Sequence, residues 1–153
     1  MEKSKKEGRY QRIYDQIAQL MPKSADAHAR MASIIAVLHH KMEGFFWTGF
    51  YLLNDGKLIV KMYQGPVACM ELKKDTGVCW AAINEKRSIL VDDVEKFPGH
   101  IACDSRSKSE IAVPFYNQEN QIAGVLDIDS QALSNFDETD REWLEKILKL
   151  VYS

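Results

Sequence analysis

The stretch from Phe45 to Tyr63, "FFWTGFYLLNDGKLIVKMY", decides the fold. It contains two apolar runs of strand length, and "NDG" at Asn54 to Gly56 lies between them. Asn, Asp and Gly tolerate the left-handed backbone that tight hairpin turns require. The stretch is therefore predicted to form a β-hairpin.

Two helices are predicted before this hairpin. Apolar residues from Tyr10 to Met21 repeat at helical spacing, and Pro22 ends the pattern. Ser24 can cap a second helix, which has one apolar stripe and ends by Gly44. The basic cluster at the N-terminus is expected to be a solvated tail; its members are Lys3, Lys5 and Lys6.

The chain after the hairpin alternates between short helices and strands. Asp75 or Thr76 can cap a helix through "GVCWAAINEKR", and "SILVDD" is a predicted strand. A loop of about 15 residues follows, and loops of that length are commonly functional. "SEIAVPFY" and "IAGVLDID" flank "NQEN" as a second hairpin, and Asp137 can cap a last helix. The pattern predicts one α+β domain, residues 1–153, with helices at both ends of a central antiparallel sheet.

Charge and composition exclude several classes of function. The 153 residues include 20 basic and 22 acidic side chains, and this balance argues against nucleic acid as a partner. No apolar run approaches the roughly 18 residues that span a bilayer, and no signal peptide is evident, so a cytosolic protein is expected. Three cysteines in a reducing compartment suggest buried thiols, metal ligands or redox chemistry rather than a disulfide framework.

The neighbourhoods of the three cysteines are more specific than their number. "GPVACMEL" surrounds Cys69, "GVC" ends at Cys79, "FPGHIACDSRSKSEIAVP" surrounds Cys103, and "GVLDIDS" follows in the same order. Together these motifs closely resemble the free methionine-(R)-sulfoxide reductases, which are GAF-domain enzymes. The resemblance extends from "FFWTGFY" to "FDETDREWLEKI". It departs from the family pattern at "KKDTGVCWAA" around Cys79. It implies a GAF-like fold in which the N-terminal and C-terminal helices pack on one side of the sheet.

The resemblance also implies a mechanism that needs no metal and no bound cofactor. A thiolate attacks the sulfoxide, methionine leaves, and the resulting cysteine sulfenic acid condenses with a second thiol. Thioredoxin is the expected external reductant, and a homodimer is the expected assembly. Cys103 is assigned as the nucleophile and Cys69 as the first choice of resolving thiol. Cys79 remains the alternative or a relay, because the start of a helix lowers the pKa of a thiol.

Free methionine sulfoxide carries an ammonium group and an apolar side chain, and both need partners. Strand alternation places Glu110, Asp127 and Asp129 on one face of the sheet, away from the apolar residues of the same strands. Trp47 and Tyr51 have the same parity on the first strand, and Trp47 resembles the family residue that packs on the substrate methyl group. These five residues are the predicted substrate-binding set, and a solvated sheet face is the alternative for the acids.

Two other functions remain possible at this point. GAF-like folds also serve as non-catalytic sensors of small molecules, and a turnover assay would separate the two. A zinc site formed by Cys69, Cys79, Cys103 and His100 lacks the usual C-x-x-C spacing, and metal analysis would decide it.

Overall fold

The computed structural model describes residues 1–100 and 103–153. Its helices are α1 (Lys3–Leu20), α2 (Ala27–Lys41), α3 (Gly77–Glu85) and α4 (Glu138–Leu148). Its strands are β1 (Trp47–Asn54), β2 (Lys57–Gln64), β3 (Glu71–Leu72), β4 (Ile89–Val91), β5 (Ser109–Tyr116) and β6 (Ile122–Ser130). Short 3-10 turns occur at Met21–Lys23 and Val94–Lys96. None of the helices in these two ranges is long and apolar enough to cross a lipid bilayer.

The strands form one six-stranded sheet in the order β3-β2-β1-β6-β5-β4. Every neighbouring pair is antiparallel, so the predicted sheet type is confirmed. The hairpin of β1 and β2 turns at Asp55 and Gly56, which have φ angles of 52° and 77°. These left-handed angles suit a two-residue turn and confirm the hairpin expected from "NDG". The second predicted hairpin is the pair β5 and β6.

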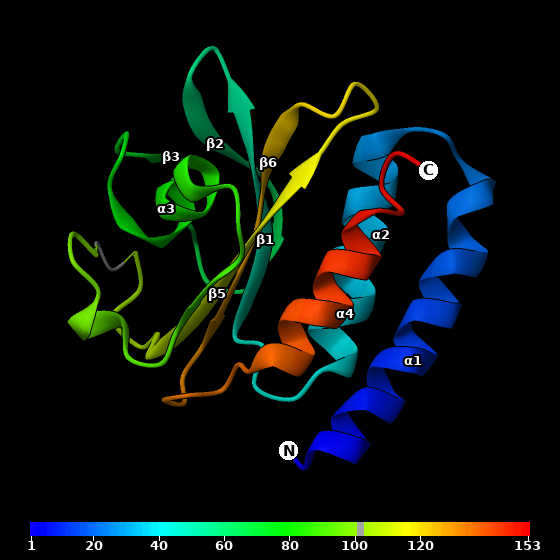
Figure 1. Ribbon diagram of the computed structural model, residues 1–153, viewed down its shortest axis with the longest axis horizontal. Helices are drawn as coiled ribbons and strands as arrows, with labels where there is room; N and C mark the ends of the chain where they lie inside the picture. Colours follow the sequence, from blue (N-terminus) through cyan, green and yellow to red (C-terminus); the bar gives the residue numbers. More distant parts are fainter. Residues whose placement is uncertain (101–102) are drawn as a thin grey trace.

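The helices cover the two faces of the sheet unequally. Helices α1, α2 and α4 lie on one face, whereas α3 and the long connecting segments lie on the other (Figure 1). A large apolar core fills the first interface and includes Tyr10, Ile35, Phe50 and Leu126. A smaller core around Trp80 lies under α3. The expected packing of the N-terminal and C-terminal helices on one side is therefore confirmed.

Helix boundaries differ from the predicted ones by a few residues. Asp26 rather than Ser24 caps α2, because its side chain accepts a hydrogen bond from Ala29 N at 2.8 Å. Helix α2 ends at Lys41, before Gly44. Thr76 is at the N-cap position of α3, but neither it nor Asp75 makes a side-chain capping bond. Asp137 caps α4 as predicted, within a capping box.

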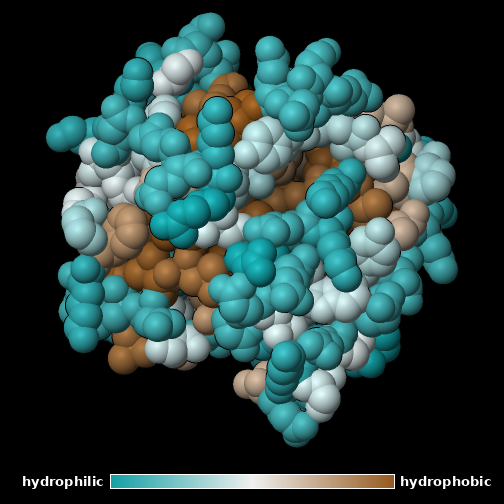
Figure 2. Space-filling model, viewed as in Figure 1, coloured by the Kyte–Doolittle hydropathy of each residue, from teal (hydrophilic) through white to brown (hydrophobic). Residues whose placement is uncertain are grey.

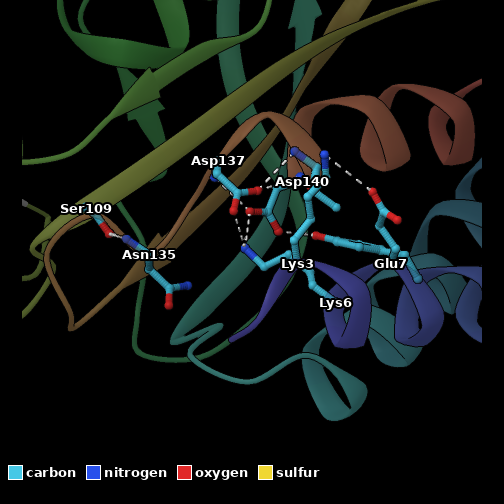
Figure 3. Close-up of polar contacts among 9 residues, drawn as sticks. Lys3, Lys6, Glu7, Ser109, Asn135, Asp137 and Asp140 are labelled. Atoms are coloured by element: carbon cyan, nitrogen blue, oxygen red, sulfur yellow. Dashed lines mark hydrogen bonds and ion pairs between the residues drawn. The ribbon is translucent and has the colours of Figure 1, made fainter.

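The N-terminal lysines are not a solvated tail. Lys6 lies in α1 with only 7% of its side chain exposed, and its Nζ is 2.7 Å from Asp140 Oδ2 (Figure 3). Tyr10 also donates to Asp140 Oδ1 at 2.5 Å, and Asp137 N donates to Asp140 Oδ2 at 2.8 Å. A buried carboxylate at the start of α4 therefore ties this helix to α1. Lys3 and Lys5 are exposed on α1.

Candidate active site

A pocket of about 210 Å³ opens on the face of the sheet that carries α3. Strands β1, β5 and β6 form its floor, and the start of α3 and the segments after β2 and before β5 form its walls. The structure brings all eight residues of the predicted site together in its lining, namely Trp47, Tyr51, Cys69, Cys79, Cys103, Glu110, Asp127 and Asp129.

A second hollow, of about 500 Å³, lies between α4, the segment before β4, and the end of β5 with the turn that follows it. It is larger, but its lining contains no cysteine and only one acidic residue, Glu145. By volume alone this hollow would be the candidate active site. The cysteines and the acidic cluster, however, line the smaller pocket.

Cys69 and Cys103 form a disulfide at the pocket, with their Cα atoms 5.6 Å apart. This is the pairing expected from the sequence, although 34 positions separate the two residues. Cys103 is exposed and Cys69 is partly exposed, so solvent reaches this end of the pocket. Two disulfide-bonded sulfurs cannot serve as thiolate ligands, so this structure does not contain the four-residue zinc site considered above.

Cys79 differs from the other two cysteines because it is free and buried. Burial, reinforced by the nearby Asp127, Glu110 and Asp129, raises the pKa of its thiol well above the ordinary value. Cys79 lies in the first turn of α3, as predicted. The prediction that the helix lowers the pKa of its thiol is wrong. Desolvation and neighbouring carboxylates outweigh the partial positive charge of a helix end.

The three predicted acids form one cluster on the floor of the pocket. Glu110 and Asp129 are directly opposite each other on β5 and β6, and Asp127 is two residues away on the same face. Glu110 and Asp127 are buried, so the alternative of a solvated sheet face is wrong for these two. Burial first, and then the neighbouring carboxylate of Asp127, raises the pKa of Glu110 and of Asp129 well above normal. Burial also raises the pKa of Asp127, although hydrogen bonds from Glu110 and Cys79 oppose this effect.

One oxygen of this cluster, Asp127 Oδ1, is buried without a hydrogen-bond partner among the described residues. A buried polar atom without a partner is costly, so it marks a position where a bound molecule would be stabilised. Cys79 Sγ and carboxylate oxygens of Glu110 and Asp127 also lie within 4.8 Å of one another, a spacing that could hold a metal ion.

Aromatic rings line the part of the pocket that β1 forms. Trp47 stacks against both Tyr51 and Tyr63, with ring centroids 5.8 Å and 5.2 Å apart. Gly49 makes this possible, because a Cβ at that position would lie 2.5 Å from both the Trp47 ring and Tyr63 Cβ. The strand therefore needs a glycine where the indole lies flat along the sheet.

The same aromatic residues fix the segment that carries Cys69. Trp47 Nε1 donates to the carbonyl of Pro66 at 3.0 Å, and the Tyr51 hydroxyl donates to the carbonyl of Cys69 at 3.0 Å. Gly65 has a φ of 124° and passes so close to β1 that a Cβ would lie 2.7 Å from Phe46 O. Burial raises the pKa of Tyr51, with smaller contributions from Asp127 and other acids, so its hydroxyl stays protonated and able to donate.

Several lining residues were not included in the predicted set. His100 contacts the pocket, its Nε2 is buried without a partner among the described residues, and burial lowers its pKa. Asp104 is paired with Arg106, whose hydrogen bonds hold the pKa of Asp104 at about 2. Phe46, with Arg106 over its ring, was missed, although it belongs to the aromatic run that begins β1.

Comparisons with known proteins agree with this fold. The GAF domain family model matches residues 23–151. The chain is 45% identical, over 97% of its length and 94% of the relative's, to GAF domain-containing protein A of Dictyostelium discoideum. It is 39% identical to free methionine-R-sulfoxide reductase of Escherichia coli, over 78% of this chain and 72% of that protein.

A solved structure extends the comparison to three dimensions. Free methionine-R-sulfoxide reductase from Neisseria meningitidis, in complex with its substrate, superposes with a TM-score of 0.88 at 37% identity. The match covers 94% of this chain and 86% of that chain. The chain therefore belongs to the GAF domain family. Within that family it belongs with the free methionine-R-sulfoxide reductases, which are oxidoreductases.

Proposed function

We propose that this protein reduces free L-methionine-(R)-sulfoxide to L-methionine, with Cys103 as nucleophile and Cys69 as resolving thiol. The observation that carries the proposal is the Cys69–Cys103 disulfide beside a pocket that also contains aromatic and acidic side chains. The reductases among the relatives support the same activity.

The reaction takes two chemical steps. A thiolate at Cys103 attacks the sulfoxide sulfur, the oxygen is transferred to Cys103 as a sulfenic acid, and methionine leaves as a thioether. The thiol of Cys69 then attacks the sulfenic sulfur, so an S–S bond forms and the oxygen departs as water. A Cα separation of 5.6 Å is within the usual span for this bond.

Asp129 supplies the proton that the sulfoxide oxygen must accept. Because burial raises the pKa of Asp129, this carboxyl group remains protonated over a pH range in which exposed carboxyl groups are ionised. Cys79, whose pKa is also raised, remains a neutral thiol and is less suited to attack than the exposed Cys103. It stays the alternative resolving thiol or a relay.

The acidic cluster gives the site a preference for a free amino acid. The positive charge of the substrate ammonium group favours the ionised forms of Glu110 and Asp127, so it can bind these two carboxylates through charge-assisted hydrogen bonds. Trp47 and Tyr51 offer an apolar wall to the substrate side chain. A methionine sulfoxide inside a polypeptide has no ammonium group and would leave buried acids without partners. Each unmet polar group costs roughly 1–3 kcal/mol, so a large specificity gap is expected.

The cycle ends when an external dithiol reduces the disulfide, and we place thioredoxin in this role. A disulfide that must be opened in every turnover fits a reducing compartment, so we place the reaction in the cytosol. The whole chain acts as one catalytic domain in this proposal. The homodimer implied by the family resemblance stays a prediction, which light scattering of the purified protein would test.

The proposal is tested by incubating the protein with dithiothreitol and each epimer of free methionine sulfoxide, and measuring the methionine released. Turnover of the R epimer with little or none of the S epimer is expected. Equal turnover of both epimers would contradict the proposed stereochemistry. Binding without turnover of either epimer would favour a non-catalytic sensor.

The specificity is tested with the N-acetylated R-sulfoxide and with two variants, Asp127→Asn and Glu110→Gln. Each variant should raise the KM for the free substrate about tenfold or more, because a charge-assisted contact is lost. Cys103 in both variants should still react with peroxide, which needs no ammonium contact. If the N-acetylated sulfoxide is reduced as well as the free amino acid, the acids do not bind an ammonium group.

A further inference from the structure

The loop that carries Cys69 also exposes the two most accessible large apolar side chains among the described residues. Val67 is 80% exposed and Met70 is 76% exposed. They lie two residues before and one residue after Cys69, so their Cα atoms are within about 7 Å of its Cα atom. Figure 2 shows hydrophobic surface among hydrophilic side chains on the side of the molecule where α3 and the long connecting segments lie.

Val67 and Met70 are exposed even though the loop that carries them is firmly attached to the sheet. The carbonyl of Pro66 accepts from Trp47, the carbonyl of Cys69 accepts from Tyr51, and Val60 N donates to the carbonyl of Met70 at 2.9 Å. The backbone is therefore fixed on both sides of the disulfide while Val67 and Met70 point into solvent. Apolar side chains held in this way lose little conformational freedom when a partner covers them.

The four residues 67–70 carry no charge, although the exposed Glu71, Lys73 and Lys74 follow them. At residues 67–70 themselves, burial of apolar area is therefore the source of affinity. The matching surface must therefore be apolar and must reach the disulfide.

We propose that Val67 and Met70 form the docking surface for the protein that reduces the Cys69–Cys103 disulfide, a small protein with a reduced dithiol set in an apolar surface. This inference rests on the proposed function. One thiolate of the partner attacks one sulfur of the disulfide, a mixed disulfide forms, and the other sulfur leaves as a thiolate. The second thiol of the partner then breaks the mixed disulfide. Two electrons pass to this chain, and the partner is left with the disulfide.

The test compares two reductants, thioredoxin as the protein dithiol and dithiothreitol as a small dithiol with no surface to dock. Met70→Ser and the double variant Val67→Ser with Met70→Ser are assayed for methionine release at saturating sulfoxide. The double variant should raise the KM for thioredoxin about tenfold, since exposed apolar anchors at a docking site commonly contribute this much. Met70→Ser should raise the same KM less, and its rate with dithiothreitol should match that of the unmodified protein.

Leu133→Ser is the matched control, because Leu133 is an apolar side chain with 58% exposure outside this loop. It should leave both rates unchanged. An unchanged KM for thioredoxin in the double variant, or an equal rise in the Leu133 control, would overturn the docking surface. Failure of the proposed function is distinguishable, because the unmodified protein would then release no methionine even with dithiothreitol.

Discussion

The three thiols of this chain have the same chemistry but different surroundings. Cys103 is exposed, Cys69 is partly exposed and bonded to it, and Cys79 is buried beside three acids. A thiolate forms most easily where water or a positive group can stabilise the charge. Exposure therefore separates the two cysteines of the disulfide from the third more clearly than position along the chain does.

Substitution of each cysteine tests this assignment. Cys103→Ser should abolish methionine release. Without an added dithiol, Cys69→Ser should release about one methionine per enzyme and then stop at the sulfenic acid instead of at a disulfide. Cys79→Ser should retain multiple turnovers with dithiothreitol. Single-turnover assays measure the methionine released by each of the three variants, and mass spectrometry identifies the oxidation state of its remaining cysteines. A burst that survives Cys103→Ser and disappears with Cys79→Ser would reverse the roles.

Tyr51 acts on Cys69 through the backbone, because its hydroxyl donates to the Cys69 carbonyl. Tyr51→Phe keeps the ring in the pocket and removes only this bond. We expect the first methionine to be released at an unchanged rate and the disulfide to form about fivefold more slowly, as a hydrogen bond of roughly 1 kcal/mol implies. Rapid quenching with a sulfenic acid trap measures the second step.

Tyr63→Phe is the matched control for this prediction. Its ring also stacks on Trp47, but its hydroxyl makes no hydrogen bond within the described part of the chain. Equal slowing in both variants would mean that the hydroxyl of Tyr51 does not position Cys69.

Among the secondary-structure elements, the junction of α1 with α4 contains a buried ion pair. Lys6 and Asp140 have side-chain exposures of 7% and 1%, and they join residues 134 positions apart. Lys6→Met keeps most of the side-chain volume but leaves the carboxylate without its cation. The free energy of unfolding should fall by about 3 kcal/mol, measured by urea denaturation.

Lys3→Met provides the comparison for this loss. Lys3 is paired with Glu7 at 4.0 Å, and its side chain is 77% exposed, so the change should be below about 1 kcal/mol. If the two variants lost stability equally, the buried Lys6–Asp140 pair would not stabilise the junction of α1 with α4.

This junction also indicates what local sequence patterns can predict. The hairpins and the cap of α4 were predicted because turn and capping residues act on their immediate neighbours. Lys6 was misjudged because its partner lies near the other end of the chain. The two-residue strand β3 was not predicted, since pairing with Leu58 and Ile59 rather than any local pattern creates it.

At the scale of the whole molecule, the sheet separates a large apolar core from a smaller core that tolerates three acids. Strand alternation predicted which face carries Glu110, Asp127 and Asp129, and Cys69 was the first choice of resolving thiol for Cys103, with Cys79 as the alternative. Neither prediction could reveal that α3 would bury the acids and Cys79 and raise their pKa values. That effect depends on how tightly the elements close over the pocket, which no single segment encodes.

The raised pKa values of the acids make the stability of the empty protein depend on pH. Between the unfolded pKa values near 4 and the higher folded values, the folded state binds more protons than the unfolded state. Stability should therefore fall as the pH rises above about 4, across this interval. Glu110→Gln, which cannot ionise, should have a higher Tm at pH 8 than the unmodified protein and a weaker dependence on pH.

Calorimetry from pH 5 to pH 8 would measure both effects. Glu119→Gln is a suitable control, because Glu119 is exposed on the turn between β5 and β6 and should leave the profile unchanged. A Tm that rises with pH in the unmodified protein would contradict the raised pKa values of the buried cluster.

The burial of Cys79 has a practical consequence for following this protein in a mixture. In the oxidised folded chain no accessible thiol remains, because Cys69 and Cys103 are joined and Cys79 is enclosed. Iodoacetamide should then add no mass to the folded oxidised form, two carbamidomethyl groups to the folded reduced form, and one group to the oxidised form once it is denatured. The mass of the intact chain would thus give the fraction of molecules whose disulfide has not yet been reduced, without any assay of methionine.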